Sequence, residues 1–129
     1  VARGGYVLHQ TGAGTPDAII IATGSEVELA MNAAKALGEK GRNVRVISMP
    51  CVEVFLLQPR DYQEDVLPSA VRARVAVEAG IRDYWYRFVG LDGRIVGMSS
   101  FGASAPAGDL FKYFGITADA VQAAVEELL

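Results

Sequence analysis

Cysteine and histidine each occur once in this sequence of 129 residues, and each scarcity narrows what the protein can be. The single cysteine, Cys51, excludes an internal disulfide and fits a reducing compartment, so a cytoplasmic location is expected. The single histidine, His9, leaves no spare ligand for a metal cluster and no second candidate for a histidine-dependent triad. The sequence therefore predicts no metal site in this chain.

Long apolar runs and an excess of positive charge are also missing. No run of about 18 apolar residues is present, so no segment is predicted to span a membrane. The formal net charge is −3, and the lysines and arginines are scattered along the chain. This distribution argues against a nucleic-acid partner and against an anionic membrane surface.

The composition that remains is that of an ordinary globular domain, with 51% hydrophobic and 21% charged residues. A chain of this length buries roughly two thirds of its unfolded surface, enough for a core without disulfides. It opens with "VARGGYVL", without an initiator methionine or a signal peptide. We interpret residues 1–5 as the end of a linker from a preceding domain and residues 6–129 as a single α/β domain. The chain is therefore expected to be part of a longer protein.

Short apolar segments alternate with helix-like segments along the chain. Residues 18–22, "AIIIA", form a continuous apolar run, as expected of a strand covered on both faces. Further strands are predicted at 4–10, 44–49, 74–78 and 94–98. Helices are predicted from 25 to 37, in two short pieces on either side of Pro59, at 81–90, at 107–115 and after Thr117. The alternation predicts right-handed parallel crossovers and a three-layer αβα domain with a mostly parallel sheet.

The turn in "ATGSEVEL" joins the apolar run at 18–22 to the best-specified helix. Ser25 is suited to cap this helix, and Glu28 completes a capping box three residues later. Gly24 stands alone, whereas the dinucleotide and P-loop fingerprints need further glycines or a lysine. We interpret the turn as structural, with free amides at 24–26 that allow weak anion binding. One face of the helix is expected to be buried and to carry Val27, Ala30, Met31, Ala34 and Leu37.

Ligands of parallel α/β sheets usually bind at the carboxyl ends of the strands. The turn after 18–22 and the loop after 94–98 should meet at that edge. Their small and hydroxyl residues form a candidate weak anion site made of Gly24, Ser25, Ser99, Ser100 and Gly102. We interpret Glu78 and Gly80 at the end of the strand at 74–78 as structural, with Glu78 holding the turn.

Cys51, His9 and Glu78 are the residues from which a nucleophile, a base and an orienting group could be assembled. We expect no catalytic site from them. His9 would lie at the opposite end of the sheet from Cys51 if the first strand is antiparallel. Cys51 is interpreted instead as a small buried residue that follows a strand.

Aromatic residues crowd the helix predicted at 81–90. They cannot all point inward on one helix, so burial against another domain or subunit is expected. The residues concerned are Tyr84, Trp85, Tyr86 and Phe88.

Several stretches taken together resemble one known family. They are "ATGSEVELA", "VISMPCVEVFLLQ", "VLPSAVRARVAVEAGIRDYWYRFVG" and "GMSSFGASAPAGDLFKYFGIT". In order and spacing they are similar to the C-terminal domain of transketolase over nearly the whole chain. The resemblance implies a five-stranded mixed sheet with one antiparallel edge strand, which would be residues 6–10. One departure is Cys51, where the family usually has serine or threonine, and it further disfavours a catalytic cysteine.

The resemblance also implies properties of a parent enzyme. Transketolases are homodimers that use thiamine diphosphate and Mg²⁺ or Ca²⁺ and move a two-carbon ketol unit from a ketose phosphate to an aldose phosphate in the pentose phosphate pathway. The family binds cofactor and substrate in its two preceding domains, so no cofactor or substrate residue is carried over to this chain. The expected role is a structural, dimer-supporting domain that is inactive alone.

Three alternatives stay open at this point. The chain could be a regulatory module that binds an anion or another small ligand. It could be the equivalent domain of another thiamine diphosphate enzyme, such as a 2-oxoacid dehydrogenase, although "SMPCVEVF" favours transketolase. It could also be a free-standing small enzyme that uses Cys51 or Glu78.

Overall fold

The computed structural model describes residues 4–23, 26–78, 93–97 and 118–129. Its strands are β1 (Tyr6–Gln10), β2 (Ala18–Ala22), β3 (Val44–Ser48), β4 (Arg74–Glu78) and β5 (Arg94–Gly97). Its helices are α1 (Glu26–Glu39), α2 (Val52–Leu56), α3 (Arg60–Val66) and α6 (Ala118–Leu128). No helix in this described part is long and apolar enough to cross a membrane.

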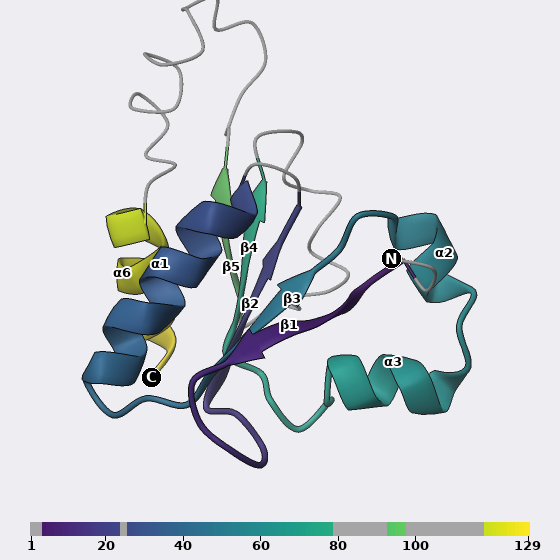
Figure 1. Ribbon diagram of the computed structural model, residues 1–129, viewed down its shortest axis with the longest axis horizontal. Coiled ribbons are helices and arrows are strands. Elements are labelled where there is room, and N and C mark those ends of the chain that lie inside the picture. Colours follow the sequence, from purple (N-terminus) through teal and green to yellow (C-terminus); the bar gives the residue numbers. More distant parts are fainter. Residues whose placement is uncertain (1–3, 24–25, 79–92, 98–117) are drawn as a thin grey trace, which may run out of the picture.

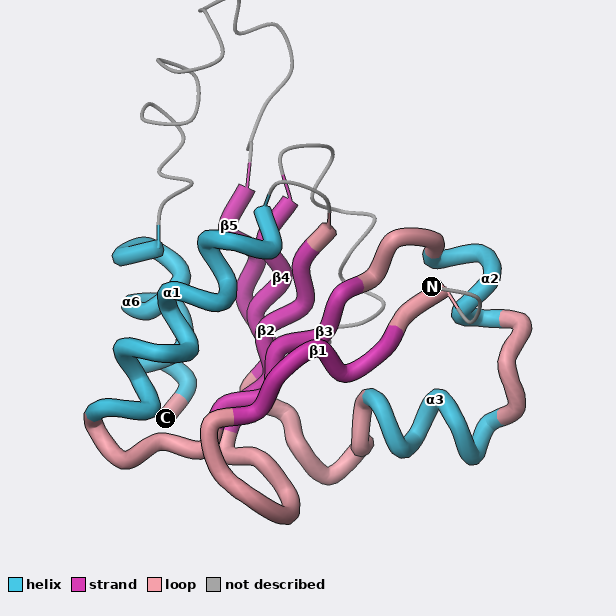
Figure 2. Tube along the Cα trace, viewed as in Figure 1, coloured by secondary structure: helices cyan, strands magenta, loops and turns pink. Residues whose placement is uncertain are grey.

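The strands form one five-stranded sheet in the order β1-β3-β2-β4-β5. β1 pairs antiparallel with β3 at the edge of the sheet, and the remaining neighbours are all parallel. Helices α1 and α6 cover one face, and α2 and α3 lie on the other side (Figures 1 and 2). The predicted αβα architecture, with a mostly parallel sheet and an antiparallel edge strand, is confirmed.

The core is organised by β2, whose five residues are all completely buried. Successive side chains of a strand point to opposite faces, so Ile20 packs in the cluster beneath α1 and α6. Ile19 and Ile21 pack in the cluster beneath α2 and α3, with Met49 and Phe55. Each buried isoleucine contributes roughly 1.5–3 kcal/mol relative to an exposed one.

Helix α1 presents the predicted apolar face to the sheet. Ala30, Ala34 and Leu37 are buried, while Val27 and Met31 are partly buried against the same cluster. Ala33 is also buried, which widens the face beyond the predicted stripe. The proposed cap at Ser25 lies outside the described residues. The closing helix α6 packs on the same cluster through Val121, Ala124 and Val125.

Pro59 separates α2 from α3, as predicted, and stands at the N-cap of α3. Strand ends differ from the predictions by at most two residues, since β1 begins at Tyr6, β3 ends at Ser48 and β5 ends at Gly97. The predicted helices at 81–90 and 107–115 lie outside the described residues, as do the aromatic side chains of the first.

The chain reaches β1 through two glycines that are locked against α2 and α3. The carbonyl of Gly4 accepts a hydrogen bond from the Cys51 amide at 2.9 Å. The carbonyl of Gly5 accepts one from the Tyr62 hydroxyl at 2.7 Å. Gly4 has a φ of +79°, and a Cβ there would overlap the Cys51 carbonyl oxygen and the Phe55 amide nitrogen. We call Gly4, Gly5, Cys51, Phe55 and Tyr62 the N-terminal clamp.

At the amino ends of β2 and β3, the side chain of Asn43 holds the loop between β1 and β2. Its Nδ2 donates to the carbonyls of Ala13 at 2.8 Å and Thr15 at 3.3 Å. Its Oδ1 accepts from the Gly12 amide at 3.1 Å and from Gln10 Nε2 at 3.0 Å. One amide side chain therefore satisfies three backbone polar groups of a loop that has no secondary structure of its own.

Candidate functional site

The carboxyl ends of the four parallel strands lie level, at the edge where ligands bind in many α/β proteins. In the strand register, Ala22 stands beside Ser48 on one side and Val77 on the other. Glu78 stands beside Gly97. The structure therefore brings together the strand ends on which the predicted anion site depends.

The residues of that predicted anion site lie outside the described residues: Gly24, Ser25, Ser99, Ser100 and Gly102. Gly80 also lies outside them, and of Glu78 only the strand backbone is described. The site and the structural roles of Glu78 and Gly80 therefore stay predictions.

One described neighbour of the predicted site carries negative charge. Glu26, the first residue of α1, is only 6% exposed, and its amide donates to the Thr23 carbonyl at 3.0 Å. An acidic side chain in the first turn of a helix already complements the helix dipole. It would also repel a phosphate, so an anion at this edge has an unfavourable neighbour.

Cys51 and His9 are not brought together. His9 is exposed on β1 and pairs with Val46 in the interior of β3, whereas Cys51 lies beyond the carboxyl end of β3. β1 is antiparallel, which is the condition under which their separation was predicted. Cys51 is half-buried, whereas the sequence predicted a buried residue, and its thiol donates a hydrogen bond to Glu53 Oε2 at 3.5 Å.

No group of three or more histidine, cysteine, aspartate or glutamate side chains within the described ranges could hold a metal ion. The divalent metal of a thiamine enzyme takes oxygen ligands of this kind. The described residues therefore offer no set of ligands for that metal.

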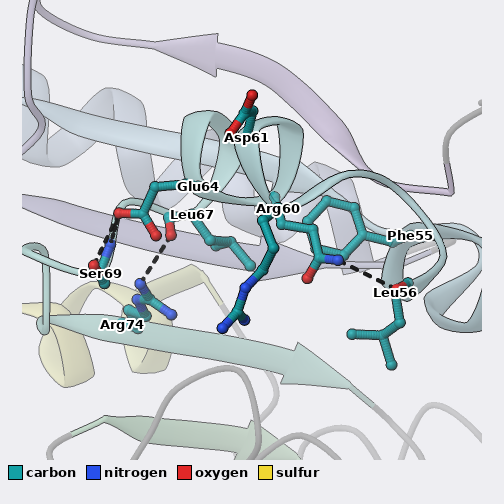
Figure 3. A pocket seen from close by; sticks show the side chains of 9 residues that line it. Phe55, Leu56, Arg60, Asp61, Glu64, Leu67, Ser69 and Arg74 are labelled. Carbon is teal, nitrogen blue, oxygen red and sulfur yellow. Dashed lines mark hydrogen bonds between the residues drawn. The ribbon is translucent and has the colours of Figure 1, made fainter.

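A pocket of about 550 Å³ opens on the side of the sheet that carries α2 and α3 (Figure 3). Arg60 from α3 and Arg74 from the start of β4 both line it, together with the acidic residues Asp61 and Glu64. The positive and negative charges of the lining are equal in number. No sequence motif marks this pocket, because its lining comes from segments that are separate in the chain.

The charged groups of the pocket are engaged in holding the connection from α3 to β4. Arg74 donates from Nε to the Val71 carbonyl at 2.8 Å, and from Nη2 to the carbonyls of Pro68 at 2.7 Å and Leu67 at 3.2 Å. Burial lowers the pKa of Arg74 below its usual range. These contacts fasten the backbone of the connection at three carbonyls.

Glu64 closes the same connection from the other side. Its Oε2 accepts hydrogen bonds from the Ser69 amide at 2.7 Å and the Ser69 hydroxyl at 2.9 Å. The backbone N–H of Ser69 and then its hydroxyl lower the pKa of Glu64 below its ordinary value of 4.5. Ser69 thus acts as a turn residue bound to a carboxylate, without the histidine that would activate its hydroxyl.

Comparison with known proteins shows to which family this chain is similar. A family model for the transketolase-like TK C-terminal domain matches residues 4–117. The chain belongs to the transketolase C-terminal domain family. It is 57% identical over 129 residues to transketolase 2 of Escherichia coli (strain K12), across all of this chain and 19% of that protein.

Solved structures agree with this assignment. The transketolase from Leishmania mexicana superposes with a TM-score of 0.87 at 45% identity, over 98% of this chain and 18% of that one. A split-gene transketolase, described as an inactive β4 tetramer, matches with a TM-score of 0.71 at 25% identity, over all of this chain and 43% of that one. This transketolase C-terminal domain therefore spans about a fifth of the curated relatives it matches, and relatives of this kind carry other domains in the same chain.

Proposed function

We propose that this chain is the structural, dimer-supporting C-terminal domain of a transketolase. The parent enzyme transfers a two-carbon ketol unit from a ketose phosphate to an aldose phosphate in the pentose phosphate pathway. It is a cytoplasmic homodimer that uses thiamine diphosphate and Mg²⁺ or Ca²⁺, bound by domains that precede this one. The chain alone is inactive.

One observation carries this proposal: the whole chain matches only 19% of a transketolase. The described residues also lack a set of ligands for a metal ion. Within the described ranges, no nucleophile and base are assembled either, which favours a role in holding other domains in place. The solved split-gene transketolase chain, described as inactive as a β4 tetramer, is in keeping with a catalytic contribution from elsewhere.

Calorimetry and an activity assay test the proposal together. The full-length polypeptide should bind thiamine diphosphate in the presence of Mg²⁺ and catalyse ketol transfer between sugar phosphates. The 129-residue chain should do neither under the same conditions. Micromolar binding of thiamine diphosphate by the 129-residue chain, or a full-length polypeptide without ketol transfer, contradicts the proposal.

A second candidate function is weak anion binding at Gly24, Ser25, Ser99, Ser100 and Gly102. The level carboxyl ends of the strands favour it, because they bring the flanking loops to one edge. The buried Glu26 counts against it. Titration of the ¹⁵N-labelled chain with inorganic phosphate should shift the amide signals of these residues selectively, and shifts spread over the whole surface contradict the site.

A further inference from the structure

Most of the exposed large apolar side chains lie on the two segments that flank the N-terminal clamp, β1 and the end of α2. Five such side chains are exposed among the described residues, and only Leu129 lies away from the clamp. The other four form what we call the clamp patch: Val7, Leu8, Leu56 and Leu57. Single exposed apolar residues are ordinary, but a group at one place marks an interaction surface.

The clamp explains why these residues are neighbours. Val7 and Leu8 follow Gly5 by two and three residues along β1. Leu56 and Leu57 directly follow Phe55, whose amide nitrogen a Cβ on Gly4 would overlap. The start of β1 lies near α2 in Figure 1. The point at which the chain enters the domain is therefore held against α2.

The backbone polar groups at the end of α2 already have hydrogen-bond partners within the domain. The Leu56 carbonyl accepts a hydrogen bond from Gln63 Nε2 at 3.2 Å, and the Gln58 carbonyl accepts one at 2.9 Å from the same nitrogen. The Leu57 amide donates to the Val54 carbonyl at 3.2 Å. Residues 56–59, "LLQP", carry no charge. An apolar partner can cover this tip without stranding these polar groups.

Leu57 has the most exposed side chain of the four residues in the patch. Its side chain is 82% exposed, although leucine loses roughly 1.5–3 kcal/mol when it is left in water instead of being buried. It sits at the C-cap of α2 and makes its backbone contacts through the amide, so the side chain is not needed for the fold. A partner outside the described residues accounts for it best.

We propose that the clamp patch is the surface on which the domain preceding this one in the same polypeptide docks. The inference rests on the proposed function, which places this chain at the C-terminal end of a longer transketolase. About four fifths of the matched relatives lies outside the part that corresponds to this chain. Because the chain enters at Gly4, which is fixed against α2, the preceding domain is joined to this one next to the segments that carry these four side chains.

Cysteine labelling of the full-length polypeptide tests the docking. Leu57→Cys should react with a maleimide at least tenfold more slowly than Glu39→Cys, which places a cysteine at an exposed position at the end of α1. The rates are read for each site by peptide mass spectrometry, and both should become equal in denaturing urea. The proposal is overturned if Leu57→Cys is labelled as fast as Glu39→Cys while both polypeptides are folded.

Hydroxyl-radical footprinting of the unsubstituted full-length polypeptide gives an independent readout. In the domain as described, Leu57 is 82% exposed and Leu129 is 43% exposed, so Leu57 should oxidise faster. If the preceding domain docks on the patch, Leu57 should oxidise more slowly than Leu129. If Leu57 still oxidises faster in the full-length polypeptide, docking is contradicted.

Dilution separates the preceding domain from a second copy of the chain as the occupant. Protection by a domain of the same polypeptide should be unchanged when the protein is diluted until it dissociates. Protection that disappears on dilution assigns the patch to a second copy and overturns the proposal. Ketol transfer by the same sample, measured separately, shows whether the proposed function has failed instead.

Discussion

Replacing Gly4 by alanine should destabilise the domain far more than the same replacement at Gly14. The two glycines have almost the same backbone conformation, with φ of +79° and +76°. Their surroundings are opposite, because a Cβ at Gly4 would overlap the backbone of Cys51 and Phe55, whereas a Cβ at Gly14 would have nothing within 4 Å. The pair therefore separates backbone strain from steric overlap.

The expected magnitudes follow from these two contributions. A left-handed conformation costs an alanine about 1–2 kcal/mol, offset by about 0.4–1 kcal/mol from the stiffer unfolded chain. Gly14→Ala should therefore lose about 1 kcal/mol of unfolding free energy. Gly4→Ala adds an overpacking cost of about 1–3 kcal/mol, at the upper end because backbone atoms cannot rotate away. We expect a total loss of about 3–4 kcal/mol.

Urea unfolding followed by circular dichroism measures the difference. With a slope of about 1–3 kcal/mol per molar urea, the midpoints of the two variants should differ by about 1–2 M. Hydrogen exchange of the Cys51 amide, which donates to the Gly4 carbonyl, should rise in Gly4→Ala only. Equal midpoints for the two variants, with the Cys51 amide equally protected in both, would refute the argument that the clamp is tightly packed.

Two further predictions concern the polar side chains that hold loops. Asn43→Asp should lose about 2 kcal/mol in urea unfolding, since an aspartate cannot donate to two carbonyls and sets its charge against them. Asn32→Asp on the exposed side of α1 should stay within about 0.5 kcal/mol, and equal losses contradict the role of Asn43. For Glu64, the lowered pKa means that its stabilisation is present above the unfolded value and is lost as the pH falls below 4.5. When the unfolding free energy is measured across this pH range, it should fall less steeply in Glu64→Gln than in the unsubstituted chain. Ser69→Ala keeps the backbone donor and should show an intermediate fall. An equally steep fall in Glu64→Gln and the unsubstituted chain contradicts the stabilising role of Glu64.

Much of the architecture was predictable because its causes are local. A strand buried on both faces needs an uninterrupted apolar run, and Ala18–Ala22 is one. An amphipathic helix needs a period of 3.6 residues, which Ala30, Ala34 and Leu37 follow. Pro59 interrupts helix hydrogen bonding wherever it stands, and it separates α2 from α3. Right-handed crossovers then leave few ways to order the strands.

The candidate site was predictable only in outline. Strand polarity places the carboxyl ends at one edge, and the antiparallel direction of β1 keeps His9 away from Cys51. The predicted anion residues lie outside the described part of the chain, so that site stays a prediction. The pocket beside Arg74 could not be anticipated, because its guanidinium binds backbone carbonyls, and every residue type offers those.

The sequence by itself therefore determined which segments are strands and helices, which faces are buried, and the family to which the chain belongs. Tertiary structure alone decided how the chain enters the domain and where its surface is apolar. Tyr62 binds Gly5 across 57 residues, and Asn43 binds Gly12 across 31. Such contacts have no period and no motif, since they depend on distant backbone groups that meet only after the sheet has formed. The exposed Leu57 resembles any other leucine until the fold leaves it beside the N-terminal clamp.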